Sequence, residues 1–198
     1  DTDKIGNVSE DNIIWATDTL DKEDALPDID KVLATDKCYI LASHAPLERI
    51  GALLDAARNA GVPVIFCNDA HIAGIDRELK LWGDHAIAGT KGAEVIPELK
   101  KSEKDFVIPK RRYSGFFQTD LDILLKELGV KTVVMTGLHA HMCVRHTSAD
   151  AYCLGYDVVV AKEATDSFTE EDYVNGLAYL KTCYGADAYT NEELIAAF

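Results

Sequence analysis

Short apolar runs alternate with amphipathic helical patterns along most of this 198-residue chain. For example, a helical pattern over residues 46–59 carries its apolar side chains on one face, and the apolar run 62–67 follows it. Parallel strands need long crossover connections, which helices usually supply, so this alternation is typical of a parallel sheet covered by helices. The pattern predicts one α/β domain, doubly wound, that spans residues 1–198.

Six parallel strands and the helices between them are expected in this domain. The predicted strands are 12–17, 62–67, 105–109, 132–136, 157–161 and 187–189. Helices are predicted at 46–59, around 93–100, from a Thr119 cap to Leu128, at 143–154, at 170–182 and from 191 onwards. Residues 18–45 fit this alternation poorly and are expected to form a long loop with local helix.

Composition narrows the class of protein. The formal net charge is −14, and the longest basic run is Lys110-Arg111-Arg112, so a nucleic-acid partner is not expected. Five cysteines without a CxxC spacing favour a reducing, cytoplasmic location. Neither a signal-peptide pattern nor an apolar run of the ~18 residues that a membrane span needs is visible, so no membrane partner is expected.

Chemically active side chains follow four of the predicted strands, at Asp18, in the run Asn68-Asp69-Ala70-His71, at Lys110 and within TGLHAHMC, which ends at Cys143. Ligands of open parallel sheets bind beyond the carboxyl ends of the strands, so these segments are expected at one edge. Each residue alone has an ordinary explanation: Cys143 as a small buried side chain, Asp18 in an acidic loop, Lys110 among surface charges. Together they supply a thiol, a base and a cation, and a helix start at Cys143 would favour the thiolate.

Four longer stretches carry a family resemblance: VPVIFCNDAH (62–71), LWGDHAIAGTKGAEVIPEL (81–99), VIPKRRYSGFFQTDLDILL (107–125) and TVVMTGLHAHMCVRHTSADAYCLGYDVVVAKEATDS (132–167). In order and spacing they resemble the isochorismatase-like cysteine hydrolases, the superfamily of nicotinamidases and N-carbamoylsarcosine amidases. This resemblance implies a six-stranded parallel sheet flanked by helices.

The resemblance also implies a catalytic triad. Lys110 and Cys143 match its lysine and its nucleophile, and Asp18 matches its general base, with Asp21 or Asp24 as alternatives. An oxyanion hole is implied at a cis peptide bond between Leu138 and His139 and at the backbone N–H of Cys143.

Further residues are implied to line a substrate pocket or to hold a metal ion. The pocket candidates are Trp82, Tyr113, Phe116 and His141, joined by Phe117, although core packing also explains such aromatic residues. Asp69, His71 and His85 match a metal site for zinc, iron or manganese; relatives with the same residues and no need for metal leave this open.

The sequence therefore favours a cysteine-dependent amidohydrolase that releases ammonia from a small amide or carbamoyl substrate through a thioester. Two alternatives stay open: a metal-dependent hydrolase in which Cys143 is incidental, and a noncatalytic binding protein on the same fold. The resemblance implies a homo-oligomer, either a dimer or a tetramer. The substrate itself is not predicted.

Overall fold

The computed structural model describes residues 45–198, so the predicted strand 12–17 and the residues up to 44 lie outside the described part. The described strands are β1 (Ile65–Asp69), β2 (Phe106–Lys110), β3 (Thr132–Leu138), β4 (Asp157–Asp166) and β5 (Asp187–Tyr189). β1 pairs with β2, and β4 lies between β3 and β5; every pairing is parallel. Parallel strands are confirmed, but the described residues form sheets of two and three strands rather than one sheet of six.

Six helices connect or flank these strands in the described part: α2 (Ala45–Ala60), α3 (Leu79–Trp82), α4 (Leu121–Glu127), α5 (Arg145–Cys153), α6 (Glu170–Tyr184) and α7 (Asn191–Ala197). The expected helix at 93–100 is replaced by two 3-10 turns, η4 (Lys91–Ala93) and η5 (Pro97–Leu99). α4 begins after Asp120 rather than at a Thr119 cap. The helix expected from Cys143 begins earlier, as the π-helical turn η6 (Ala140–Val144) that leads into α5.

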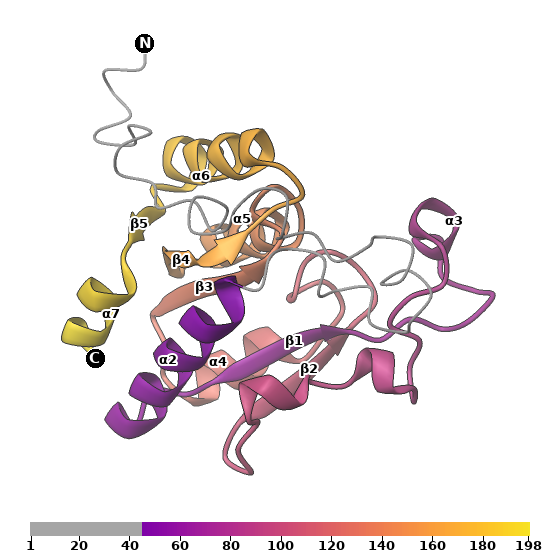
Figure 1. The fold of residues 1–198 in the computed structure, drawn as a ribbon, viewed down its shortest axis with the longest axis horizontal. Coiled ribbons are helices and arrows are strands. Elements are labelled where there is room, and N and C mark those ends of the chain that lie inside the picture. Colours follow the sequence, from indigo (N-terminus) through magenta and orange to yellow (C-terminus); the bar gives the residue numbers. More distant parts are fainter. Residues whose placement is uncertain (1–44) are drawn as a thin grey trace.

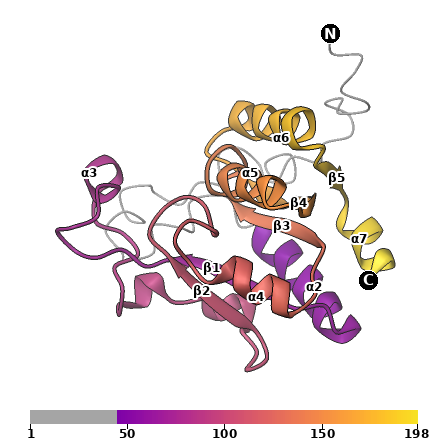
Figure 2. The same ribbon diagram turned by 180° about the vertical axis from the view of Figure 1, so that it is seen from behind.

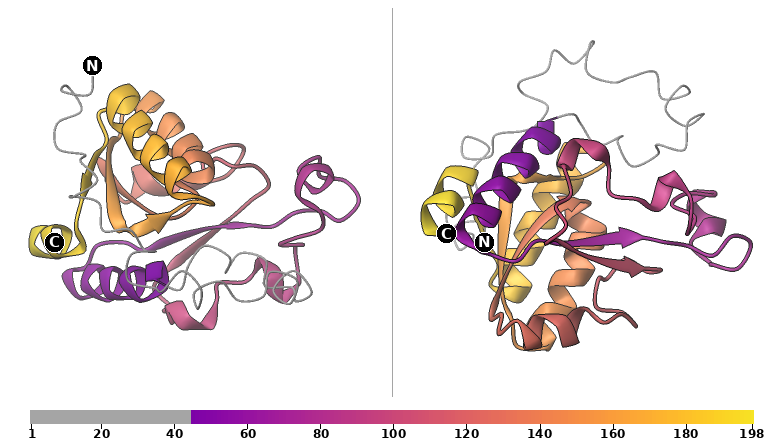
Figure 3. Two further views of the ribbon diagram at one scale, coloured as in Figure 1. Left: turned by 45° about the horizontal axis from the view of Figure 1, so that its top comes forward. Right: turned by 90° about the horizontal axis from the view of Figure 1, so that it is seen from below.

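Helices cover both faces of the β3–β4 pair. Figures 1 and 2 show α5 and α6 on one face and α2 and α7 on the other. α2 is fixed there by polar contacts: Arg49 Nη1 donates to Glu163 Oε1 of β4 at 2.7 Å, and Asn191 Nδ2 of α7 donates to the Arg49 carbonyl at 2.8 Å. β1 and β2 extend beside this layered unit, and α3 projects beyond the end of β1 (Figure 3).

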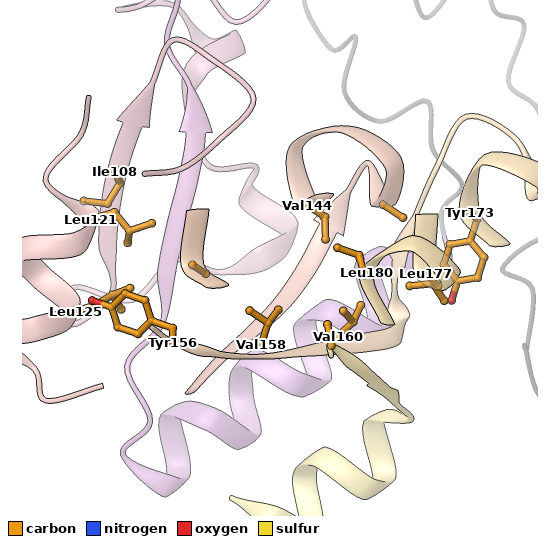
Figure 4. Close-up of a cluster of buried hydrophobic side chains, with 13 residues drawn as sticks. Ile108, Leu121, Leu125, Val144, Tyr156, Val158, Val160, Tyr173, Leu177 and Leu180 are labelled. Carbon is orange, nitrogen blue, oxygen red and sulfur yellow. The ribbon is translucent and has the colours of Figure 1, made fainter. Parts of the chain in front are cut away.

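One hydrophobic cluster joins the two sheets. Figure 4 shows Ile108, Leu121 and Leu125 beside β1 and β2, and Val158 and Val160 on β4, with Tyr156 between them. Leu177 and Leu180 of α6 are almost fully buried in the same cluster. Burying such side chains stabilises the fold by roughly 1.5–3 kcal/mol each, so this cluster fixes the strands whose ends carry the reactive residues.

Gly176 lets α6 approach the turn η6 closely. A Cβ atom at this position would lie 3.0 Å from the carbonyl carbon of Ala140, 3.0 Å from its Cβ and 3.0 Å from the His141 nitrogen. Ala140 itself is fully buried. Only glycine fits this contact without displacing backbone atoms, and the contact holds the turn that bears Cys143 against α6.

Candidate active site

The ends of β1, β2 and β3 bring the predicted reactive residues together. Asp69 and Lys110 are opposite each other in the register of β1 and β2, and the turn η6 follows β3. Cys143 of this turn is half-buried. Lys110 Nζ lies 3.7 Å from Cys143 Sγ, so the described part of the expected triad is assembled. Asp18, Asp21 and Asp24 lie outside the described residues.

Lys110 is a buried cation with three polar contacts. Its side chain is 4% exposed, and Nζ donates to Asp69 Oδ1 at 2.5 Å and to the Arg112 carbonyl at 3.1 Å. Burial lowers the pKa of Lys110, but the charges at Cys143 and Asp69 outweigh this effect and hold the pKa above its ordinary value. The ammonium is therefore kept charged within reach of the thiol.

The surroundings of the Cys143 thiol favour its protonated form at neutral pH. Burial raises its pKa to about 11, although the nearby Lys110 charge acts in the opposite direction. The sequence had suggested that a helix start would favour the thiolate; the largest influence on this pKa is instead desolvation, which penalises the charged form. Reaction through this thiol therefore needs a base to accept its proton.

The Leu138–His139 peptide bond is cis, and it lies just before the turn that carries Cys143. Burial, followed by the neighbouring charge of His141, lowers the pKa of His139 to about 4, so its ring is neutral. The ring of His139 lies against that of Phe168, with 3.9 Å between centroids. His141 has a separate polar contact: its Nδ1 lies 3.0 Å from Ser167 Oγ.

Two further pocket candidates, Trp82 and Tyr113, are linked to His139 through Phe168. Trp82 is half-exposed; its Nε1 donates to the Tyr113 hydroxyl at 3.0 Å, and its ring lies 5.9 Å from that of Phe168. Trp82, Tyr113, His141 and Phe168 thus form an aromatic rim. The structure places Phe116 elsewhere, stacked on Tyr156 against the hydrophobic cluster.

His71 has a ring nitrogen available for a metal ion. The residue is fully buried, its Nδ1 lies 3.3 Å from Asp76 Oδ2, and its Nε2 has no hydrogen-bond partner. Nε2 lies 4.0 Å from Asp69 Oδ1 and 3.9 Å from Glu78 Oε2, and the ring centroids of His71 and His85 are 4.7 Å apart. A proton on Nδ1, donated to Asp76, leaves the Nε2 lone pair facing these groups, which is the usual second-shell arrangement of a metal-binding histidine.

Besides its contact with His71, the Asp76 carboxylate accepts hydrogen bonds from two other groups. Its carboxylate accepts from the Ile72 N–H at 2.9 Å and from Arg111 Nε at 3.0 Å. The Arg111 guanidinium lowers the pKa of Asp76 well below its ordinary range, so the carboxylate stays charged. Within residues 45–198, no three His, Cys, Asp or Glu side chains are close enough together to hold a metal ion in their present positions. The orphaned His71 nitrogen and the oxygen donors near it nevertheless fit an ion such as zinc in chemistry.

Within residues 45–198, a groove separates β1 from β3 and reaches the site. It consists of two adjoining cavities of about 200 and 280 Å³ that share Leu54, Ile65, Cys67 and Val134 among their lining residues. Val64 and Thr132, at the amino ends of the strands, line one cavity, whereas Asp69, Lys110 and Cys143 line the other. We call these two cavities the interstrand groove.

Sequence reasoning missed Asp76, Glu78, Arg111 and Phe168. Arg111 had been interpreted as a surface charge beside Lys110, but its guanidinium binds the buried Asp76. Asp76 and Glu78 follow the DAH motif closely enough to be suspected, yet only the fold shows which carboxylates turn inward. Phe168 directly follows the quoted stretch 132–167, and no local pattern indicates its contact with His139.

The chain matches a known domain over most of its length. The sequence profile of the isochorismatase domain matches residues 39–193. Nicotinamidase 3 of Arabidopsis thaliana is 32% identical over 149 residues, which cover 69% of this chain and 75% of that protein. Ureidoacrylate amidohydrolase RutB of Pantoea ananatis is 31% identical over 148 residues, covering 64% of this chain and 59% of the relative.

Solved structures agree with these sequence matches. N-carbamoylsarcosine amidase from Thermoplasma acidophilum superposes with a TM-score of 0.70 at 35% identity, covering 75% of this chain and 83% of that one. Nicotinamidase PncA from Bacillus subtilis superposes with a TM-score of 0.68 at 31% identity, covering 73% and 83% of the two chains. Asp18 precedes the region that the domain profile matches. The chain belongs to the isochorismatase family.

Proposed function

We propose that this protein is a cysteine-dependent amidohydrolase that releases ammonia from a small amide or carbamoyl substrate. Relatives named as nicotinamidase, amidase and amidohydrolase support a hydrolase that acts on carbon–nitrogen bonds other than peptide bonds. The observation that carries the proposal is the position of Lys110, whose buried Nζ lies 3.7 Å from Cys143 Sγ while it is bonded to Asp69.

The first half of the reaction forms a thioester. Asp18 is proposed to accept the thiol proton as Cys143 Sγ attacks the carbonyl carbon of the substrate, which forms the S–C bond and places negative charge on the carbonyl oxygen. The backbone N–H groups of His139 and Cys143 would donate to this oxygen, each contributing about 3 kcal/mol. The C–N bond then breaks, and ammonia leaves with the proton returned by the carboxylic acid.

The second half releases the product. Water gives one proton to the same carboxylate and attacks the thioester carbon; the S–C bond breaks, and the sulfur recovers a proton. Lys110 stabilises the thiolate at both stages and keeps Asp69 in place. The aromatic rim of Trp82, Tyr113, His141 and Phe168 offers flat surfaces to a small planar amide.

A screen for ammonia release tests the proposal directly. The substrates are nicotinamide, N-carbamoylsarcosine, ureido acids, biuret and maleamate, and each active one is repeated with Cys143→Ala and with the matched surface variant Cys153→Ala. We expect Cys143→Ala to abolish release and to lose the acyl adduct that mass spectrometry detects, whereas Cys153→Ala stays active. Activity that persists in Cys143→Ala would rule out the covalent reaction.

We further propose that Asp69, His71 and His85, together with Glu78, hold a divalent metal ion such as zinc, iron or manganese. The orphaned Nε2 of buried His71 supports this assignment. When bound, the ion would position or polarise the substrate, while the thiol supplies the nucleophile.

Calorimetric titration with Zn²⁺ or Mn²⁺ tests the metal site without an activity assay. We expect His71→Ala to lose the binding isotherm and His146→Ala, which changes an exposed histidine, to keep it. Identical isotherms in both variants would place the metal elsewhere. A metal-dependent activity that survives in Cys143→Ala would instead favour the metal-dependent hydrolase.

A noncatalytic binding protein on this fold is the remaining alternative. It would bind a small amide, detected by calorimetry, without turning it over in the ammonia assay. The buried Lys110 beside a half-buried thiol weighs against it, because burying an ammonium costs free energy that simple binding does not need.

A further inference from the structure

A further cavity lies at the opposite ends of the strands from the candidate active site. Asp157 and Asp187, the first residues of β4 and β5, line it, and β4 runs parallel to the strand β3 whose carboxyl end leads to Cys143. Its volume is about 390 Å³, and its lining shares no residue with the interstrand groove. The other polar side chains of the lining are all tyrosines: Tyr152, Tyr156, Tyr184 and Tyr189. We call it the tyrosine cavity.

Two of these tyrosines keep ring surface available to a ligand. Tyr152 is 53% exposed and Tyr189 is 39% exposed. The Tyr152 ring lies 5.6 Å from that of Tyr184 between centroids, and Tyr156 is buried with its hydroxyl donating to Asp122 Oδ1 at 2.9 Å. The faces of aromatic rings carry partial negative charge and attract cations, so a hollow lined by them favours a positively charged ligand.

The neighbouring rings already bind one cation of the chain. Arg145 Cζ lies 3.7 Å from the centroid of the Tyr179 ring, and Tyr179 packs edge-on against Tyr184 with 5.8 Å between centroids. Neither Arg145 nor Tyr179 lines the tyrosine cavity. The arginine therefore occupies the flank of the aromatic cluster and leaves the rings within the cavity to another cation.

The cavity also carries negative charge that no described cation neutralises fully. Gly155 and Gly185, which follow the ends of α5 and α6, both line it, and the carboxyl ends of helices carry partial negative charge. Asp187 is paired with Lys181. The Asp157 carboxylate, in contrast, forms no hydrogen bond or ion pair with any residue in the described range 45–198.

We propose that the tyrosine cavity binds an organic ammonium ion, a quaternary or protonated amine whose alkyl groups lie against the tyrosine rings and whose charge lies near Asp157. An inorganic cation such as Ca²⁺ needs six or more oxygen ligands, whereas the cavity offers two carboxylates, of which one is already paired. Rings and carboxylates together match a cation with an apolar shell. This site is separate from the candidate active site and does not depend on the proposed reaction.

Calorimetric titration of the full chain tests whether charge drives the binding. The probes are choline and dimethylbutanol, the uncharged isostere of choline with a carbon atom in place of the nitrogen. We expect one choline to bind per chain and the isostere to bind at least about tenfold more weakly. Equal affinities would make the cavity a site for apolar groups and overturn the proposal. Failure of choline to bind at about 50 mM would overturn it as well.

Matched substitutions test which side chains hold the cation. Tyr152 and Asp157 are exposed, so replacing them leaves the hydrophobic core intact. We expect Tyr152→Leu and Asp157→Asn each to weaken choline binding about three- to tenfold. Tyr152→Phe, which keeps the aromatic face, and Asp120→Asn, an exposed acid outside the cavity, should stay within about twofold of the unmodified protein. Unchanged affinity in either Tyr152→Leu or Asp157→Asn contradicts the assignment.

Amide chemical shifts locate the bound cation. We expect choline to shift the amide signals of Gly155 and Gly185, which line the cavity. Shifts confined to Trp82 and Tyr113 would place the cation at the aromatic rim of the candidate active site and overturn the proposal. These readouts are independent of turnover, so a chain that binds choline here and releases no ammonia would reject the proposed function and leave this site intact.

Discussion

Lys110 holds its positive charge where water cannot screen it, and this makes its removal costly. In Lys110→Ala, both the developing thiolate and the Asp69 carboxylate lose their charge partner. We expect kcat/KM for ammonia release to fall about 10²- to 10³-fold, in the range of a lost transition-state donor. Lys126→Ala, which removes an exposed lysine paired with Asp122, should change it little. Equal, small effects in the two variants would contradict the assignment.

The pH dependence of Cys143 follows from its raised pKa of about 11. Because only the thiolate is alkylated, the reactive fraction increases as the pH rises towards that value. We expect the rate of iodoacetamide labelling at Cys143, followed by mass spectrometry, to increase about tenfold per pH unit between pH 7 and pH 10. A plateau at or below pH 8 would indicate a preformed thiolate.

At the residue scale, the sequence identified Lys110 and Cys143 because each stands directly beyond an apolar run, at the edge where parallel strands end. It could not identify Arg111 or Phe168 as members of the site. Their partners, Asp76 and His139, are distant along the chain, and only packing decides which of several neighbouring charges turns inward.

The contact between α6 and the turn η6 can be tested with two helical glycines. Gly176→Ala places a Cβ 3.0 Å from Ala140 and His141, whereas Gly51→Ala in α2 meets no atom within 4 Å. We expect Gly176→Ala to lower the free energy of unfolding by about 1–3 kcal/mol. Gly51→Ala should raise it by about 0.5–1 kcal/mol. Denaturant titration measures both. A neutral Gly176→Ala would show that the turn moves freely.

The segment between β1 and α3 orients His71 through Asp76. In Asp76→Asn the carboxylate that fixes the Nδ1 proton is lost, so we expect zinc affinity to fall about 10- to 100-fold. Asp84→Asn, two residues after the end of α3, should keep the affinity of the unmodified protein. Calorimetric titration provides the comparison, and equal affinities in the two variants would remove Asp76 from the metal site.

At the element scale, the sequence located α2 well because an apolar stripe runs along it and Gly61 and Pro63 mark its end. It placed β1 too early, at 62–67 rather than Ile65–Asp69, because Val62 and Val64 look the same in a strand as in the turn before it. The π-helical turn at Cys143 has no sequence signal, since it depends on the close approach of α6.

At the scale of the whole molecule, the alternation of strands and helices was sufficient to predict a parallel α/β fold. The division into sheets of two and three strands was not predicted, because the sequence treats every apolar run as equivalent. The hydrophobic cluster still joins the two sheets (Figure 4). Among residues 45–198, no helix has the length and apolar character to cross a bilayer. The cytoplasmic location and the oligomeric state stay predictions.

The burial of Cys143 also has a consequence for how the protein withstands peroxide. Sulfenic acid forms from the thiolate, and a thiol with a pKa of about 11 provides very little of it at neutral pH. Cys153 and Cys183 are exposed and present their sulfur atoms to the oxidant first. Peptide mass spectrometry after brief treatment with hydrogen peroxide should therefore find oxidised sulfur at Cys153 and Cys183 while Cys143 is still reduced. Cys143 would then stay reduced after the exposed cysteines have been oxidised.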